Sequence, residues 1–239
     1  MVRLLLDRQR GDLPAVASDA RELQAMTEVA DAAQPGLGVD LRALALISLG
    51  ATQFWTDAYR DAERNLESGI ALARRIGRPY LEFTGLAQWA AAAIIESFTR
   101  AVELGREAAG LAERHGWTDD PAFGLVGTSL GATLAWQGRL EEAEHWLQTA
   151  ERVLRAEADQ PGTAAPMRFV RGELELLRNR DSAALAAFQA ADLVAGRLAS
   201  PHMLIPWIRA LLLLAMVRLG QELPGGPGLT ETHHGQQEQ

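Results

Sequence analysis

The feature that most constrains the fold of this chain is a recurring spacing of twelve residues between two small side chains. The pairs are Gly50 with Ala62, Gly131 with Ala143, and Gly172 with Ala184. In each case a large apolar residue follows the alanine by four positions, and a small residue follows by seven. Two antiparallel helices joined by a short turn approach closely only where their side chains are small. The spacing therefore predicts a chain built from repeated helix pairs.

The turns between these helices recur about every 40 residues along the sequence. They fall at Asp57, Ser97, Gly138, Asp181 and Gly220. This period is longer than the roughly 34 residues of a tetratricopeptide unit and lies in the range of other paired-helix solenoids. Alanine and leucine dominate a chain that is 48% hydrophobic, and both enter helices at little cost. We expect an all-α, right-handed superhelical solenoid of antiparallel, tetratricopeptide-like helix pairs.

About eleven helices are expected within a single repeat domain that covers residues 1–221. They span roughly 2–10, 13–33, 39–56, 59–77, 80–96, 98–115, 121–137, 139–158, 164–179, 181–198 and 202–220. Turns are expected between helix pairs at 34–38 and 160–162, where Pro-Gly dipeptides occur. Residues 222–239 have no apolar period and are predicted to form a disordered tail.

The charge of the chain bears on its partners and its compartment. A formal net charge of −8 argues against direct nucleic-acid binding and against an anionic membrane surface. The absence of cysteine excludes disulfides and thiolate metal sites and is compatible with a cytoplasmic location. The most apolar run, 203–219, contains Pro206, Arg209 and Arg218, so it predicts a buried helix and no membrane span.

No pattern of residues predicts an enzyme. The chain has no lysine, so a P-loop is impossible, and the HExxH zinc motif is absent. Asp119 and Asp120 precede Pro121 and are better explained by helix capping than by acid-base chemistry. His233 and His234 lie in the predicted tail and are no convincing metal ligands. We expect no catalytic residue, no metal and no cofactor.

The candidate binding surface is the concave face, which the first helix of each pair lines in such solenoids. Tryptophan can stack on a ring or a peptide, and arginine can bind a carboxylate or phosphate. The candidates are Trp55, Gln88, Trp89, Thr128, Trp136, Arg168, Arg171, Trp207 and Arg209. The alternative for each aromatic residue is that it fills a gap between helices. Binding of a small-molecule effector or of a regulatory protein remains open at this point.

The last helix, 202–220, has no partner helix after it. It would expose leucine, isoleucine and methionine, whereas a terminal repeat normally has a polar outer face. Either the chain is a piece or a short relative of a longer protein, or a partner or a second copy covers this face. Self-association through 202–220 is therefore one expectation.

Several segments resemble one family of regulators. They are RAVELGREAAGLAERHGW from Arg100, WTDDPAFG from Trp117, LAWQGRLEEAEHWLQTAERVLRAE from Leu134 and SPHMLIPWIRALLLLAMVRLG from Ser200. RQRGDLPAV from Arg8 fits an earlier repeat. In this order they resemble the tetratricopeptide region of large ATP-dependent LuxR-type transcriptional regulators, which are similar to the maltose-regulon activator and common in actinobacteria.

The resemblance implies a sensor function. In that family the repeats bind an inducer or a regulatory protein, between a nucleotide-binding module and a helix-turn-helix domain. Neither of those two domains is present in this chain. The leading hypothesis is a ligand- or protein-binding module of such a regulator. The alternative is a free-standing scaffold that captures a peptide or a partner protein.

Overall fold

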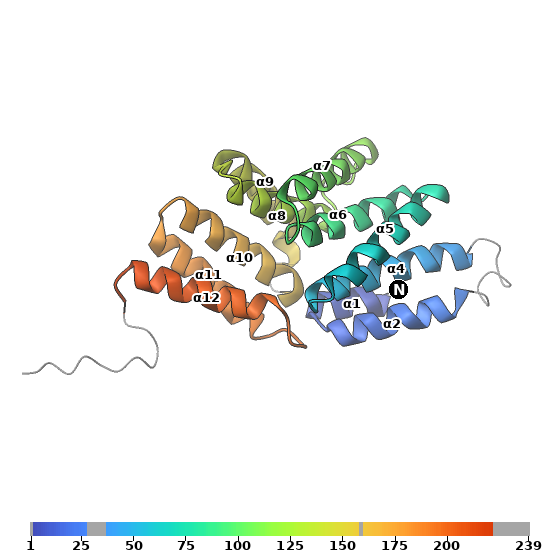
Figure 1. Cartoon of the computed structure of the whole chain (residues 1–239), viewed down its shortest axis with the longest axis horizontal. Helices are drawn as coiled ribbons and strands as arrows, with labels where there is room; N and C mark the ends of the chain where they lie inside the picture. The colour runs from blue at the N-terminus through green and yellow to red at the C-terminus, as the bar shows by residue number, and fades with distance from the viewer. Residues whose placement is uncertain (1, 28–36, 158–159, 222–239) are drawn as a thin grey trace, which may run out of the picture.

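The computed structural model describes residues 2–27, 37–157 and 160–221, and this part of the chain consists of helices joined by turns and loops, without a strand (Figure 1). Eleven α-helices and one short 3-10 helix, Leu154–Glu157, are present in it. The α-helices are α1 (Val2–Arg10), α2 (Leu13–Ala25), α4 (Leu37–Trp55), α5 (Tyr59–Arg75), α6 (Pro79–Ala93), α7 (Phe98–His115), α8 (Pro121–Trp136), α9 (Leu140–Val153), α10 (Pro161–Leu177), α11 (Asp181–Ala195) and α12 (Leu204–Arg218). The predicted all-α fold is confirmed.

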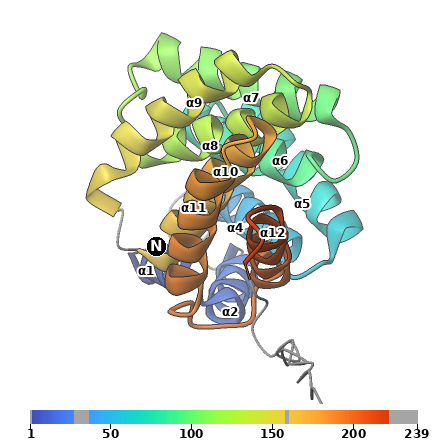
Figure 2. The ribbon, with the colours of Figure 1, turned by 90° about the vertical axis from the view of Figure 1, so that its left-hand side faces the viewer.

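Neighbouring helices form pairs, and the pairs stack into a solenoid. α4 packs with α5, α6 with α7, α8 with α9 and α10 with α11. The first helices of these pairs also pack on one another in series, from α4 through α6, α8 and α10 to α12. Figure 2 shows α7 and α9 outside α6 and α8, so the first helices form the inner layer.

The small residues lie at the predicted helix crossings. A Cβ atom on Gly50 would lie 2.9 Å from the Ala62 carbonyl oxygen. A Cβ atom on Gly131 would lie 3.4 Å from the Ala143 carbonyl oxygen and 3.4 Å from Leu147 Cβ. The close approach of α4 and α5 therefore requires glycine at position 50.

Several helix boundaries differ from those predicted. α10 begins at Pro161, and α4 begins at Leu37, so the expected turns at 160–162 and 34–38 are partly helix. Proline fits the first helical position because its missing N–H would have no partner there. α2 ends at Ala25, short of the expected 33, and residues 28–33, like 34–36 and the predicted tail 222–239, lie outside the described ranges.

Capping residues fix other boundaries as expected. Asp120 caps α8 by accepting a hydrogen bond from the Ala122 amide at 2.8 Å, and Pro121 follows it. Gly116 ends α7 in the left-handed conformation, with φ of 73°. A residue with a Cβ rarely adopts this conformation, so the glycine stops the helix.

The two ends of the solenoid meet. The Ser200 hydroxyl donates to the Gly11 carbonyl at 2.8 Å and accepts from the Leu13 amide at 3.1 Å. The Ala199 amide donates to the Arg10 carbonyl at 3.1 Å. The turn between α1 and α2 therefore packs on the loop between α11 and α12, at the lower centre of Figure 1.

Further contacts reinforce this junction. The His202 ring packs on the Trp55 ring, with centroids 4.5 Å apart, and the Met203 amide points at the Trp55 carbonyl at 3.4 Å. Gly162, at the start of α10, lies so close to the Arg8 and Gln9 carbonyls that a Cβ there would overlap them. We call the contacts of residues 8–13, Trp55, Gly162 and 198–203 the terminal closure.

Candidate functional site

A small pocket lies where the starts of α5 and α7 meet the end of α6. It has a volume of ≈ 40 Å³ and is lined by Tyr59, Glu63, Trp89, Ala92, Ala93, Glu96, Ser97 and Arg100. We call it the Trp89 pocket. The Arg100 guanidinium lies over the Trp89 ring, 5.0 Å from its centroid, as in a cation–π contact. Ligand-binding cavities typically measure about 300–1,000 Å³, so this pocket suits one side chain and not a whole metabolite.

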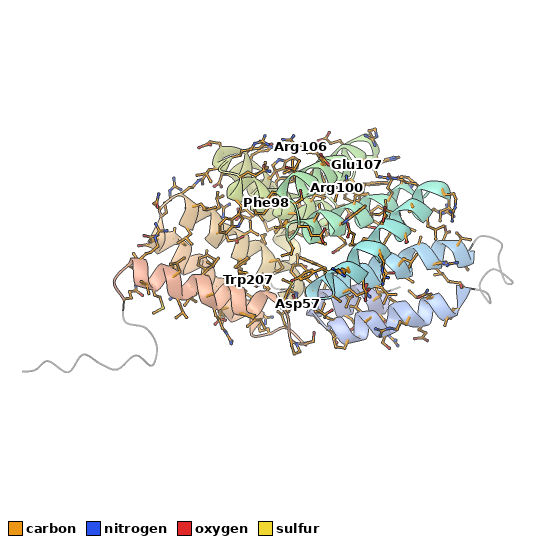
Figure 3. All side chains as sticks on the ribbon, in the orientation of Figure 1. Asp57, Phe98, Arg100, Arg106, Glu107 and Trp207 are labelled. Carbon is orange, nitrogen blue, oxygen red and sulfur yellow. The ribbon has the colours of Figure 1, made fainter. Side chains whose placement is uncertain are left out.

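The pocket adjoins the start of α12. The Tyr59 hydroxyl lies 3.7 Å from Met203 Sδ and also donates to the Asp57 carboxylate. Burial, together with the bond to Asp57, raises the pKa of Tyr59 to about 12, so its hydroxyl stays neutral. Figure 3 shows Asp57 and Trp207 close to the place where α12 meets α5, with Phe98 and Arg100 at the start of α7. Phe98 and Trp207 are 38% and 57% exposed, respectively.

Trp136, at the end of α8, reaches a buried carboxyl group on α10. Its indole Nε1 donates to Glu173 Oε1 at 3.0 Å, while the ring itself is 46% exposed. Burial raises the pKa of the Glu173 carboxyl to about 8, and the indole hydrogen bond lowers it only in part. The side chain of Trp136 is therefore oriented by α10 and presents its other edge to solvent.

Arg171 belongs to a network of ion pairs between α9 and α10. It contacts Glu144 and Glu151 at 2.9 Å and Glu175 at 3.5 Å. Arg178 also pairs with Glu144. The Arg171 side chain is only 20% exposed. Its guanidinium is held by three carboxylates of the chain itself, so an incoming anion would have to compete with them.

The remaining candidates have structural partners. Trp55 packs in the terminal closure, and Arg209 on α12 bonds Asp192 of α11 at 3.0 Å. Thr128 is buried and donates to the Gly124 carbonyl of its own helix at 2.9 Å. Arg168 contacts the Ala190 carbonyl at 3.4 Å, and Gln88 is buried within α6. Of the nine candidates, Trp89 lines the pocket, Trp136 and Trp207 expose large ring surfaces, and the others are largely engaged.

The motifs that carry the resemblance lie at joints of the fold. His115 stacks on Trp117 with ring centroids 4.5 Å apart. Tyr80 meets the edge of Trp117 at 5.2 Å and donates to Asp120 at 3.0 Å. Ser200 and His202 belong to the terminal closure. These residues thus fix how α6, α7 and α8, and the two ends of the chain, meet.

Glu173, His202 and Tyr59 were not among the candidates predicted from the sequence. Glu173 follows no motif, and its burial results from the packing of α8 against α10. The segment that starts at Ser200 was noted for its resemblance, but the partner of His202 lies 147 residues earlier, since 202 − 55 = 147. The spacing of residues along one helix carries no signal for a contact of that kind.

A second hollow is wide and open. It has a volume of ≈ 600 Å³ and lies between the end of α2, the start of α4 and the end of α5, and Arg42 and Arg75 are among its lining residues. Its lining includes Thr27, the last described residue before position 37. We assign no role to it.

The described residues contain no group of three or more His, Asp or Glu side chains that could hold a metal ion. One helix among them, α4, is long and apolar enough to cross a membrane, and 56% of it is buried within the fold. Packing against α2, α5 and α6 accounts for its apolar character.

Comparison with known proteins bears on the fold. No protein-family model and no curated protein matches the sequence. The structure is similar to the crystal structure of BtubC (BKLC) from P. vanneervenii, with a TM-score of 0.60 and 16% sequence identity. The match covers 90% of this chain and 84% of BtubC. At this identity the likeness shows a shared helical-repeat fold and nothing about function.

Proposed function

We propose that this chain is a recognition module that binds a polypeptide at the Trp89 pocket. The observation that carries the proposal is the size of the pocket, ≈ 40 Å³, together with its aromatic walls. One anchoring side chain in a pocket, surrounded by weaker contacts, is how protein interfaces concentrate their binding energy.

The charges around the pocket favour a particular kind of polypeptide. Glu63 and Glu96 are exposed at its rim, and the whole chain has a net charge of −8. Trp89 and Tyr59 supply apolar walls. The matching segment carries an apolar anchor residue with basic neighbours, since rim charges steer association and select partners. In this function the chain acts in the cytoplasm by binding, without catalysis and without a cofactor.

Selection from a displayed peptide library tests the proposal. Peptides that bind the wild-type chain should lose at least tenfold in affinity for Ala92→Leu, because the larger side chain fills the pocket. Ala186→Leu, on the exposed face of α11, is the matched control and should bind as the wild type does. Equal affinity for Ala92→Leu would place recognition elsewhere on the molecule.

A thermal-shift screen with metabolites, sugars and nucleotides tests the small-molecule alternative. A ligand present at a hundredfold excess over its dissociation constant stabilises the folded state by about 2.7 kcal/mol. We expect no shift. A dose-dependent shift in the unfolding temperature, combined with a failed peptide selection, would mean that the ligand is a small-molecule effector and no polypeptide.

We also propose, more specifically, that the module is the sensor region of a LuxR-type regulator. The support is the ordered set of segments that resembles this family, from Arg8 to Gly220. The reading frame that encodes the chain tests this proposal: it should continue into a nucleotide-binding domain on one side and a helix-turn-helix domain on the other. A reading frame that encodes neither of these domains would favour the alternative, a free-standing scaffold.

A further inference from the structure

The last helix exposes a stripe of apolar side chains that corresponds to a buried stripe in the preceding repeats. Gly50, Gly131 and Gly172 each lie five residues before the last residue of α4, α8 and α10, which end at 55, 136 and 177. The same position in α12, which ends at 218, is Leu213. In α4, α8 and α10 this position faces the second helix of the pair. In α12 the stripe through Leu213 faces solvent.

The exposed stripe follows the helical period. Its members are Pro206, Ala210, Leu213 and Val217, spaced by four, three and four residues, and all four are exposed. Leu213 and Val217 are 40% and 55% exposed. The opposite face, with Leu204, Ile208 and Ala215, is buried against α10 and α11. α12 thus has one apolar face that is buried in the fold and a second apolar face that is exposed.

Leu213 decides what kind of helix fits this stripe. At Gly50 of α4 and Gly172 of α10, the second helix approaches so closely that a Cβ would be crowded. A leucine at that position prevents the same close approach. The stripe instead fits a helix that packs at a larger distance between helix axes, with side chains of each helix inserted between those of the other, as in coiled coils.

We propose that a second copy of this chain covers the stripe, through antiparallel packing of α12 on α12. The stripe is self-complementary about its centre, because 206 + 217 and 210 + 213 are both 423. In an antiparallel pair, Ala210 therefore lies opposite Leu213 of the other copy, and Pro206 opposite Val217. A small residue faces a large one, which is what interlocking requires, and each interface of this kind is isologous.

The residues that flank the stripe obey the same symmetry. On one side Trp207 comes opposite Leu214 of the second copy, and these side chains are 57% and 42% exposed. On the other side the stem of Arg209 comes opposite Met216. Pairing therefore buries the largest exposed ring of α12 as well as the stripe.

Charge does not oppose the pairing. The helix has no acidic residue, and its two arginines are neutralised within the chain. Arg209 pairs with Asp192 at 3.0 Å, and Arg218 pairs with Asp181 at 3.0 Å. The stripe can thus be buried without desolvating an unpaired charge, which would be costly.

The residues from 222 to 239 do not match the stripe in sequence. After Gln221 the sequence has 18 residues, and Leu223 and Leu229 are the large apolar residues among them. The five residues between these leucines, from Pro224 to Gly228, are two prolines and three glycines. Such a segment does not match four apolar layers at helical spacing. A second copy does, because it presents the same stripe.

Sedimentation across a range of concentrations tests the proposal with the full chain. The wild type should form a dimer, and Leu213→Glu should weaken it at least tenfold while its helical circular dichroism stays unchanged. Leu193→Glu is the control, because Leu193 is 75% exposed on α11 and lies off the stripe. A wild type that stays monomeric at all concentrations, or a Leu213→Glu variant that dimerises equally well, would overturn the proposal.

Cysteine cross-linking tests the antiparallel register, since the chain has no cysteine of its own. The double variant Ala210→Cys with Leu213→Cys should form disulfide-linked dimers under oxidation. Ala210→Cys alone should do so poorly, because the two copies of position 210 are offset along the helices. Efficient cross-linking of the single variant would show a parallel pair and contradict the register.

Discussion

At the residue scale, glycines at the helix crossings set how closely the helices of a pair approach. Gly172 on α10 lies against the Phe188 ring of α11, and a Cβ there would overlap the ring. Gly110 on α7 is the contrasting case, because its nearest neighbour to a new Cβ is Arg114 Nη1 at 3.5 Å. Glycine is therefore required for close packing at position 172, whereas at position 110 there is space for a larger side chain.

The substitution Gly172→Ala should destabilise the chain by about 1–3 kcal/mol, because Phe188 is fully buried and cannot move freely. Gly110→Ala should stabilise it by about 0.5–1 kcal/mol through helix propensity. Urea denaturation of both variants is the measurement. A Gly172→Ala variant as stable as the wild type would mean that the crossing is looser than described.

Glu173 is the residue whose buried carboxyl makes stability depend on pH. Its pKa of about 8 in the folded chain lies above the ordinary value of 4.5. Its contribution is therefore fully present below pH 4.5 and is lost as the pH rises to about 8. Glu173→Gln keeps an acceptor for the Trp136 indole and has no charge to bury.

We expect Glu173→Gln to be more stable than the wild type at pH 8 by on the order of 3 kcal/mol, and similar to it at pH 4.5. The difference in unfolding free energy between the two proteins, measured in urea across this range, isolates the contribution of this group. A difference that is constant with pH would show that Glu173 is ionised in the folded state.

At the element scale, the ion pairs between α9 and α10 hold the second half of the solenoid together. Arg171 pairs with Glu144 and Glu151 of α9 and with Glu175 of α10. Its removal would break the ion pair of Glu151, while Arg178 and Arg180 would still pair with Glu144 and Glu175. Such a loss costs more than the original ion pair contributed.

Arg171→Gln should destabilise the chain by about 2–3 kcal/mol. Arg64→Gln is the control, since Arg64 forms an exposed ion pair with Asp61 within α5 and should cost under about 1 kcal/mol. Thermal unfolding of both variants at pH 7 distinguishes the two. Equal, small effects would show that the network does not join the helices.

At the scale of the whole molecule, the terminal closure converts a linear stack into a solenoid whose ends are in contact. His202 lies at the centre of this closure. It is buried on Trp55, and its Nδ1 accepts a hydrogen bond from the Leu204 amide at 3.2 Å. Burial lowers the pKa of His202 to about 4, so the ring is neutral in the folded chain.

Acid should therefore weaken the closure. The unfolded His202 takes up a proton near pH 6.5, whereas the folded side chain does so only near pH 4. Its stabilising contribution is thus complete above pH 6.5 and is lost as the pH falls to about 4, by about 2 kcal/mol. The protection of amides at residues 198–203 against hydrogen exchange, corrected for the intrinsic effect of pH, should fall over this range in the wild type.

His202→Asn provides the comparison, because an Asn oxygen can still accept from the Leu204 amide and does not titrate. Its exchange rates, corrected for the intrinsic effect of pH, should vary less across the same range. If the two proteins respond identically to acid, His202 is not the group that controls the closure.

The sequence by itself determined the helix pairs and their order. The spacing from Gly50 to Ala62, and its copies, is a local pattern, and local patterns suffice because each helix pair packs with its neighbours in the chain. Proline and aspartate at 120–121 and glycine at 116 likewise fixed helix ends through their own backbone preferences. Trp89 was chosen for its residue type and for its place on the first helix of a pair, and it does line the pocket.

Only the tertiary structure decided which side chains are available to a partner. Arg171 and Trp55 were equivalent to Trp89 as sequence candidates, yet one is held by three carboxylates and the other by His202. The closing contacts join residues almost 190 positions apart, as from Gly11 to Ser200. Such contacts depend on the summed curvature of every helix pair between them, and no spacing within one pair encodes that sum.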